Sequence, residues 1–123
     1  QKIITSIIED NRWKNQFYFF KVPKNVNPSY MVFPILLNPK MKFKKKSFIN
    51  LIEKKGLQTR PIISGSFLNQ PATKLYSLNK KKLKFKGAEI IEQLGFVIGL
   101  HTKKISTKQI NFIKETLFLI DKI

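Results

Sequence analysis

The segment from Ser106 to Ile123 constrains the fold more than any other part of the sequence. Ser106 and Gln109 have the spacing of a capping box, in which each residue's side chain bonds the backbone amide of the other. Ile105 and Ile110 occupy the two positions of a hydrophobic staple around this cap. The apolar residues then continue on one helical face: Ile110, Ile113, Leu117 and Ile120. This pattern predicts a closing helix with a single apolar stripe, which must pack against another layer of the protein.

Three further helices are predicted upstream. The first is at the start of the chain, where one helical face carries Ile3, Ile4, Ile7 and Ile8. The second runs from Lys42 to Lys55 with Phe48, Leu51 and Ile52 on one face, and Gly56 stands where a left-handed C-terminal cap is needed. The third is a short helix from Gly87 to Leu94, which Gly95 ends.

Two apolar segments predict strands. Met31 to Leu37 has the character of a buried strand, and Pro34 within it predicts an edge position or a bulge. Gly95 to Leu100 is a second short strand. With the four helices, these strands predict an α+β fold, in which helices pack on one face of a small, mostly antiparallel sheet.

The sequence is strongly basic, with 24 lysine and arginine residues, seven acidic residues and a formal net charge of +17. Such a charge attracts polyanions regardless of their sequence. Only Arg12 and Arg60 are arginines, however, and arginine reads bases and phosphates better than lysine does. The joint abundance of Lys, Ile, Asn and Phe indicates an A/T-rich genome, so we assign the lysine runs 44–46 and 80–82 to exposed surface.

Nucleic acid is therefore not the partner that we expect. The alternative is a small basic nucleic-acid-binding module, in which the aromatic residues 17–20 stack on bases beside Lys14, Lys21 and Lys24. The density of aromatic residues at this point favours instead a role in covering the core or a domain interface.

Features that indicate a catalytic centre are largely missing. The chain has no cysteine and one histidine, which excludes a disulfide scaffold and a cysteine-based zinc site. It has no glycine-rich phosphate loop and no nucleophile motif, and the adjacent Glu9 and Asp10 point in different directions on a helix. There is also no apolar run long enough for a membrane span and no signal peptide. We therefore expect a soluble, cytoplasmic protein.

The loop after the second helix contains the residues that we single out as a candidate site. Pro61 restricts Arg60 to an extended conformation, which directs the guanidinium along one path. A tight turn with free amides and hydroxyls is predicted from Ser64, Gly65 and Ser66. A guanidinium beside such a turn suits a phosphate. The same arginine could equally bond a carbonyl or a carboxylate and so fix the loop.

Three segments resemble one known family. The first, residues 56–72, GLQTRPIISGSFLNQPA, resembles the signature G-I-x-T-R-P-x-x-x-G-N-x-x-x-Q-P-A of the DegT/DnrJ/StrS sugar-nucleotide aminotransferases. Residues 27–35, NPSYMVFPI, are similar to its x-P-S-W-x-x-F-P-I segment, and residues 95–101, GFVIGLH, to its G-F-x-x-G-x-H segment. The three segments occur in the family's order and span most of the chain. They are most similar to the branch of 3-dehydrases and perosamine-type aminotransferases.

This resemblance implies the C-terminal small domain of a pyridoxal-phosphate enzyme of fold type I. Residues 1–15 would be the end of the helix from the cofactor domain, and residues 16–123 the small domain. The Schiff-base lysine, or the histidine that replaces it in dehydrases, would lie upstream, so we expect the chain alone to bind no pyridoxal phosphate and to be inactive. The whole enzyme would be a homodimer in deoxysugar biosynthesis for lipopolysaccharide O-antigen, with a sugar-nucleotide substrate and an amino donor such as glutamate.

The resemblance also assigns a substrate-side wall to this chain. Its residues would be Arg60, Ser64, Gly65, Ser66, His101 and Tyr30. The family usually has asparagine at the position of Ser66 and tryptophan at the position of Tyr30, so the polar contacts of the turn would differ here. From its position after the strand alone, the lone His101 is better explained as structural or exposed.

Overall fold

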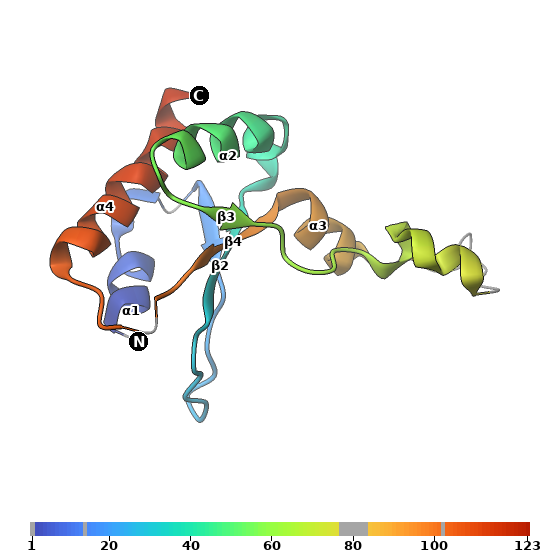
Figure 1. Cartoon of the computed structure of the whole chain (residues 1–123), viewed down its shortest axis with the longest axis horizontal. Helices are drawn as coiled ribbons and strands as arrows, with labels where there is room; N and C mark the ends of the chain where they lie inside the picture. Colours follow the sequence, from blue (N-terminus) through green and yellow to red (C-terminus); the bar gives the residue numbers. More distant parts are fainter. Residues whose placement is uncertain (1, 14, 77–83, 102) are drawn as a thin grey trace.

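A computed structural model describes residues 2–13, 15–76, 84–101 and 103–123 (Figure 1). The α-helices are α1 (Lys2–Ile8), α2 (Lys45–Lys54), α3 (Lys86–Leu94) and α4 (Thr107–Leu117). The strands are β1 (Phe17–Phe19), β2 (Val32–Leu37), β3 (Thr59–Arg60) and β4 (Gly95–Gly99). Short 3-10 helices are η1 (Asn11–Trp13), η2 (Pro39–Lys44), η3 (Phe67–Asn69), η4 (Pro71–Leu75) and η5 (Phe118–Lys122). The lysine run 80–82 lies outside the described residues.

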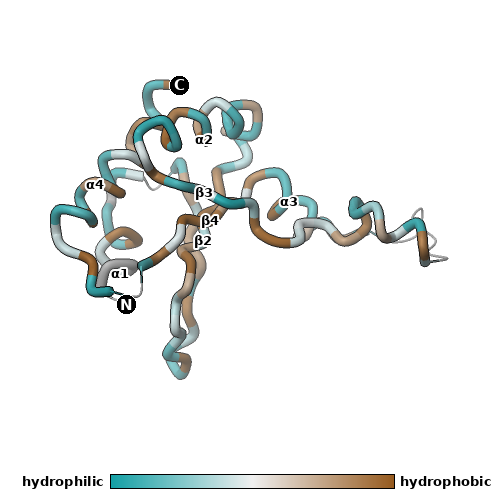
Figure 2. The backbone as a smooth tube through the Cα atoms, in the orientation of Figure 1, coloured by the Kyte–Doolittle hydropathy of each residue, from teal (hydrophilic) through white to brown (hydrophobic). Residues whose placement is uncertain are grey.

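The four strands form one antiparallel sheet in the order β1-β2-β4-β3. β2 and β4 lie at its centre and are joined from Val32↔Gly99 to Leu36↔Gly95. The hydropathy of the chain agrees with the central position of these two strands, since β2 and β4 are hydrophobic while much of α2 is hydrophilic (Figure 2). The α+β fold with a small antiparallel sheet is thus confirmed.

One face of the sheet carries the core, because alternate side chains of a strand point to opposite faces. On β2 the buried residues are Phe33, Ile35 and Leu37, while the residues between them are half-buried. The helices cover this face with buried side chains from α1, α2, α4 and η5: Ile7, Phe48, Ile52, Ile113, Leu117 and Ile120. The aromatic rings of Trp13, Phe17, Phe33, Phe48 and Phe96 fill the space between the two layers.

The closing helix follows its prediction. In the capping box, the Ser106 hydroxyl accepts from the Gln109 amide at 3.3 Å, and the Gln109 side-chain oxygen accepts from the Ser106 amide at 2.9 Å. The α-helix ends at Leu117, and the apolar stripe continues through η5 to Ile120. The stripe therefore packs on the core across a change of helix type.

The position of Pro34 differs from its prediction. β2 is a central strand, not an edge strand, and its pairing with β4 is regular at Pro34↔Val97. β1 pairs with β2 only from Ile35 to Leu37, so Pro34 has no partner in β1. A proline fits inside this strand because the neighbouring strand is short.

The first helix packs on this chain's own core. Ile7 is fully buried, whereas Ile8 is exposed; the side chains of Ile3 and Ile4 lie outside what the structure describes. The indole N–H of Trp13 donates to the Ile7 carbonyl at 3.0 Å, and its ring stacks on Phe118 at 4.6 Å. These contacts tie the start of the chain to its end.

Two segments project away from this body (Figure 1). The hairpin tip, residues 20–31, is the connection between β1 and β2 and extends below the sheet in this view. The arm, residues 66–76, contains η3 and η4 and extends to the side beyond α3. Both are extended outgrowths of an otherwise two-layered domain.

Candidate functional site

The chain changes direction sharply at the end of α2, shortly before Arg60. Gly56 has φ +95°, a conformation that glycine adopts at little cost. The Gly56 amide donates to the Glu53 carbonyl at 2.9 Å, and the Leu57 amide donates to the Ile52 carbonyl at 3.0 Å. This is a Schellman cap, with Leu57 buried as its hydrophobic contact. The predicted cap is confirmed. After it the chain enters β3, which pairs with β4.

Thr59 then fixes the start of β3. Its hydroxyl donates to the Glu53 carboxylate at 2.5 Å, and its amide donates to the same oxygen at 3.3 Å. Thr59 pairs with Ile98 and Arg60 pairs with Val97 on β4. Because Ile98 belongs to the core, alternation places Arg60 on the opposite face of the sheet, away from α1, α2 and α4.

Arg60 itself is exposed and has no ionic partner among the described residues. Within the described chain, the Arg60 guanidinium donates to the carbonyl of the adjacent Thr59 at 3.3 Å. A bond to a neighbouring residue does not tie the loop to another element. The guanidinium is therefore available to an anion on this face of the sheet.

The turn after Arg60 differs in part from its prediction. Gly65 has φ +66°, and its amide donates to the Ile62 carbonyl at 2.9 Å, so this amide is not free. Ser66 is buried, and only Ser64 exposes its side chain. The tight turn forms, but the Gly65 amide serves the turn's own structure.

Side chains from α2 and α3 support this turn. The Glu92 carboxylate accepts from the Asn69 side chain at 2.5 Å, and Glu92 also packs against Gly65. Lys45 on α2 donates to the Glu92 and Gly95 carbonyls at 3.1 and 2.9 Å, which satisfies the C-terminal end of α3. Burial lowers the pKa of Lys45, against an opposing effect of the Glu92 charge.

Tyr30 and His101 lie just beyond the Val32↔Gly99 end of the β2–β4 pairing. The Leu100 amide donates to the Met31 carbonyl at 3.2 Å, which continues the β2–β4 pairing toward these two residues. His101 is exposed, and its Nδ1 accepts from the Lys103 amide at 3.0 Å. Tyr30 packs partly against the core. His101 follows Val97, the partner of Arg60, by four residues, which is roughly 13 Å of extended chain.

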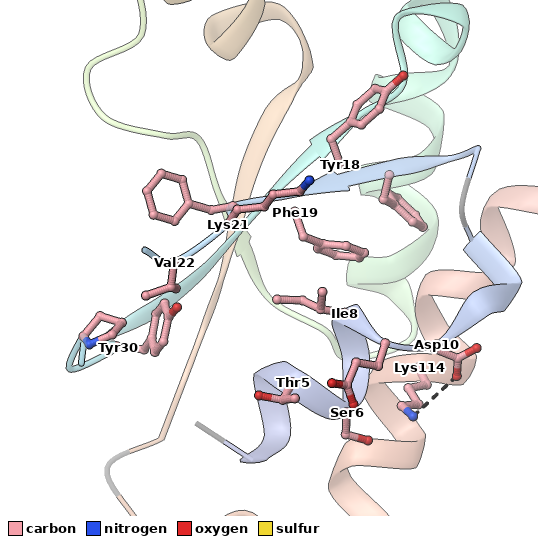
Figure 3. A pocket seen from close by; sticks show the side chains of 14 residues that line it. Thr5, Ser6, Ile8, Asp10, Tyr18, Phe19, Lys21, Val22, Tyr30 and Lys114 are labelled. Atoms are coloured by element: carbon pink, nitrogen blue, oxygen red, sulfur yellow. Dashed lines mark ion pairs between the residues drawn. The ribbon is translucent and has the colours of Figure 1, made fainter. Parts of the chain in front are cut away.

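A groove of about 1070 Å³ lies between α1 and the β1–β2 hairpin, and the sequence did not predict it (Figure 3). The hairpin contributes an aromatic wall that includes Phe19 and Tyr30, and α1 contributes Thr5, Ser6 and Ile8. The sequence signal for one wall was the aromatic run 17–20. The groove itself combines residues from both ends of the chain, so no local pattern reveals it.

Charged residues close one end of this groove. Arg12 donates two hydrogen bonds of 2.8 Å to the Asp10 carboxylate, and Lys114 on α4 lies 3.4 Å from the same group. The hydrogen bonds from Arg12 hold the pKa of Asp10 well below its usual value. These groups satisfy one another and join α1 to α4.

The described residues do not fit pyridoxal phosphate. The cofactor needs an amine for its Schiff base, and the two half-buried lysines are already engaged: Lys45 with two carbonyls and Lys114 with Asp10. The described residues also contain no group of His, Cys, Asp and Glu side chains that could hold a metal ion. No described helix has the length and apolar character to cross a membrane.

Comparison with known proteins gives a likeness among solved structures. No family model matches the sequence, and no curated protein does so. Among solved structures, the chain is similar to the E. coli GDP-4-keto-6-deoxy-D-mannose-3-dehydratase with bound hydrated PLP, with a TM-score of 0.75 and 18% sequence identity. The match covers 94% of this chain and 28% of the E. coli chain.

This chain has the fold of one part of that enzyme. The likeness agrees with the small-domain fold implied by the three sequence segments. At this identity it shows the fold alone, and the chain spans little more than a quarter of the structure that it matches.

Proposed function

We propose that this chain is the small domain of a pyridoxal-phosphate enzyme that acts on a nucleotide-linked 4-keto-6-deoxy sugar, as an aminotransferase or a 3-dehydratase. The observation that carries the proposal is the shared fold over 94% of the chain with a 3-dehydratase. Residues 1–15 are the end of an interdomain helix, and residues 16–123 are the small domain. The cofactor site, the amino donor such as glutamate, the homodimer, membership of the DegT/DnrJ/StrS family and the cytoplasmic location belong to this proposal.

In this function the chain supplies a wall of the substrate site and no chemistry of its own. Arg60 binds a phosphate of the sugar nucleotide through its planar fork of donors. The support is its exposure on the sheet face away from the helices and its lack of an ionic partner in the described chain. Ser64 offers a hydroxyl beside it, while Gly65 and the buried Ser66 shape the turn.

His101 and Tyr30 contact the substrate farther along the sheet. His101 is exposed at the end of β4, so an elongated sugar nucleotide could reach both Arg60 and His101. Tyr30 borders the same end of the sheet from the groove side. When bound to the whole enzyme, pyridoxal phosphate supplies the electron sink for the reaction.

Nuclear magnetic resonance on the ¹⁵N-labelled chain tests the wall. We expect millimolar GDP-mannose to shift the Arg60 side-chain signal and the amides of residues 64–66. Replacing Arg60 with lysine keeps the charge but loses the fork, and should weaken this binding about tenfold. The proposed substrate wall would be contradicted if GDP-mannose shifted signals all over the lysine-rich surface and if these shifts persisted in Arg60→Lys.

A second measurement addresses the cofactor. The chain should lose all pyridoxal-phosphate absorbance on desalting, because the described residues offer no site for it. Absorbance that survives desalting, and that disappears in a single lysine variant, would show a cofactor site in this chain and overturn the division of roles.

A further inference from the structure

The arm carries a patch of large apolar side chains on its surface. Phe67 is 52% exposed, Leu75 is 85% exposed and Tyr76 is 57% exposed. The rings of Phe67 and Tyr76 lie 6.1 Å apart, so they form one surface. Hydrophobic stretches along the projecting arm are visible in Figure 2. Contiguous apolar surface of this kind marks a site of interaction with another molecule.

Specific hydrogen bonds hold the arm in place. The Thr73 hydroxyl is buried and donates to the Gln70 carbonyl at 2.7 Å. The Gln70 side chain donates to the Ser64 carbonyl at 2.6 Å, and Asn69 bonds Glu92 on α3. The apolar side chains are thus presented from a structured support, which lowers the entropy lost when they bind.

The charged residues along this part of the sequence are basic, although the Glu92 carboxylate on α3 bonds Asn69 of the arm. Every charged residue between Glu53 and Glu89 in the sequence is basic. Among the described residues, Lys74 lies on the arm itself, Lys84 precedes α3 and Lys86 is the first residue of α3. Exposed lysines at the rim of an apolar patch favour a partner that carries carboxylates.

A second copy of this chain does not supply those carboxylates. Most of its few acidic side chains already bond within the described chain: Asp10, Glu53, Glu92, Glu115 and Asp121. Two copies at a net charge of +17 each would also repel one another. Charge complementarity therefore indicates a different, acidic surface.

We propose that the arm docks on an acidic polypeptide surface, whose apolar recesses take Phe67, Leu75 and Tyr76 while carboxylates at the rim pair with Lys74. The most exposed anchor, Leu75, is aliphatic, which fits a recess in a protein and has no planar face for stacking on a base. The arm also has no arginine to read a nucleic acid. This docking does not depend on the substrate wall proposed above.

Binding of the full chain to three labelled polymers tests the proposal, measured by fluorescence anisotropy at about 0.15 M salt. The polymers are a random glutamate–tyrosine copolymer, polyglutamate of equal length and single-stranded polyuridine. We expect the copolymer to bind about tenfold more tightly than polyglutamate, because it adds apolar anchoring to charge. The triple variant with Phe67, Leu75 and Tyr76 each changed to serine should lose this advantage.

Phe43→Ser is the matched control, since Phe43 is 94% exposed on η2 and lies outside the arm. It should bind the copolymer like the unmodified chain. If the triple variant does not fold, as judged by circular dichroism, the single Leu75→Ser variant replaces it and should lose part of the advantage.

Three outcomes would overturn the proposal. The first is equal affinity of the unmodified chain for copolymer and polyglutamate, which would reflect net charge alone. The second is tighter, arm-dependent binding of polyuridine, which would identify a nucleic-acid surface. The third is arm-dependent self-association in sedimentation velocity, which would make a second copy the occupant.

Discussion

The hydroxyl of Thr59 at the start of β3 donates a hydrogen bond of 2.5 Å to the carboxylate of Glu53 in the last turn of α2. This contact joins the helical layer to the edge strand of the sheet. The next residue is Arg60, so the same contact determines where the guanidinium of the proposed substrate wall lies.

Replacing Thr59 with valine should therefore lower the free energy of unfolding by about 1–2 kcal/mol, because the Glu53 carboxylate loses a donor while the side-chain shape is kept. Urea denaturation measures the change. The matched control is Thr107→Val, at an exposed position in the first turn of α4. An equal loss of stability in both variants would mean that the Thr59–Glu53 bond contributes nothing of its own.

Changing Gly56 to alanine should cost about 1–2 kcal/mol of stability, since φ +95° strains any side chain. Gly87 offers a control of opposite sign. It lies in α3 with open space around its Cα, so Gly87→Ala should be neutral or should stabilise by up to about 1 kcal/mol. Thermal unfolding of the two variants separates them, and Gly56→Ala melting at or above the unmodified chain would contradict the cap.

Removal of the Arg60 side chain should leave stability nearly unchanged. Exposed residues without structural partners alter the free energy of unfolding by less than about 0.5 kcal/mol. Arg12→Ala is the comparison, since Arg12 bonds Asp10 and lies over the Phe118 ring, and it should destabilise more. A loss above about 1 kcal/mol in Arg60→Ala would instead support the interpretation that Arg60 fixes the loop.

The Asp10 carboxylate should make stability depend on pH. Its pKa is lower in the folded chain than in the unfolded one, chiefly because Arg12 donates hydrogen bonds to it. The stabilisation is therefore complete above the usual aspartate pKa of about 3.9 and is lost as pH falls toward the lowered value. Asp10→Asn should cost up to about 1 kcal/mol at pH 7 and progressively less below about pH 4.

Urea denaturation across this pH range measures the difference between the variant and the unmodified chain. Glu9→Gln is the neighbouring control, since it removes one negative charge at an exposed position and leaves the Arg12–Asp10 hydrogen bonds in place. A cost of Asp10→Asn that is the same at pH 7 and pH 2 would exclude the ionised carboxylate as its cause.

Several elements could be predicted because their signals are local. The capping box at Ser106 and the left-handed cap at Gly56 depend on residues within a few positions of each other, and both form as predicted. The periodic apolar residues of the closing helix likewise report which face is buried. The order of the predicted helices and strands also gave the α+β class with a small sheet, which the structure confirms.

Strand pairing was harder to predict because it joins distant residues. β3 has only two residues, and it is a strand because both pair with β4. Two residues are too few to show a strand pattern in the sequence. Pro34 was assigned to an edge, whereas its place depends on how far β1 extends along β2. The groove could not be predicted for the same reason, because residues from near both ends of the chain line it.

The sequence by itself determined the helix caps at Ser106 and Gly56, the apolar faces and the excess of positive charge, since these follow from neighbouring residues and from composition. Only the tertiary structure decided that Arg60 lies on the face away from the helices and that the turn amide of Gly65 is already paired. It also decided that the arm projects from the body with its apolar side chains exposed. The physical reason is that burial and pairing depend on which segments meet in space.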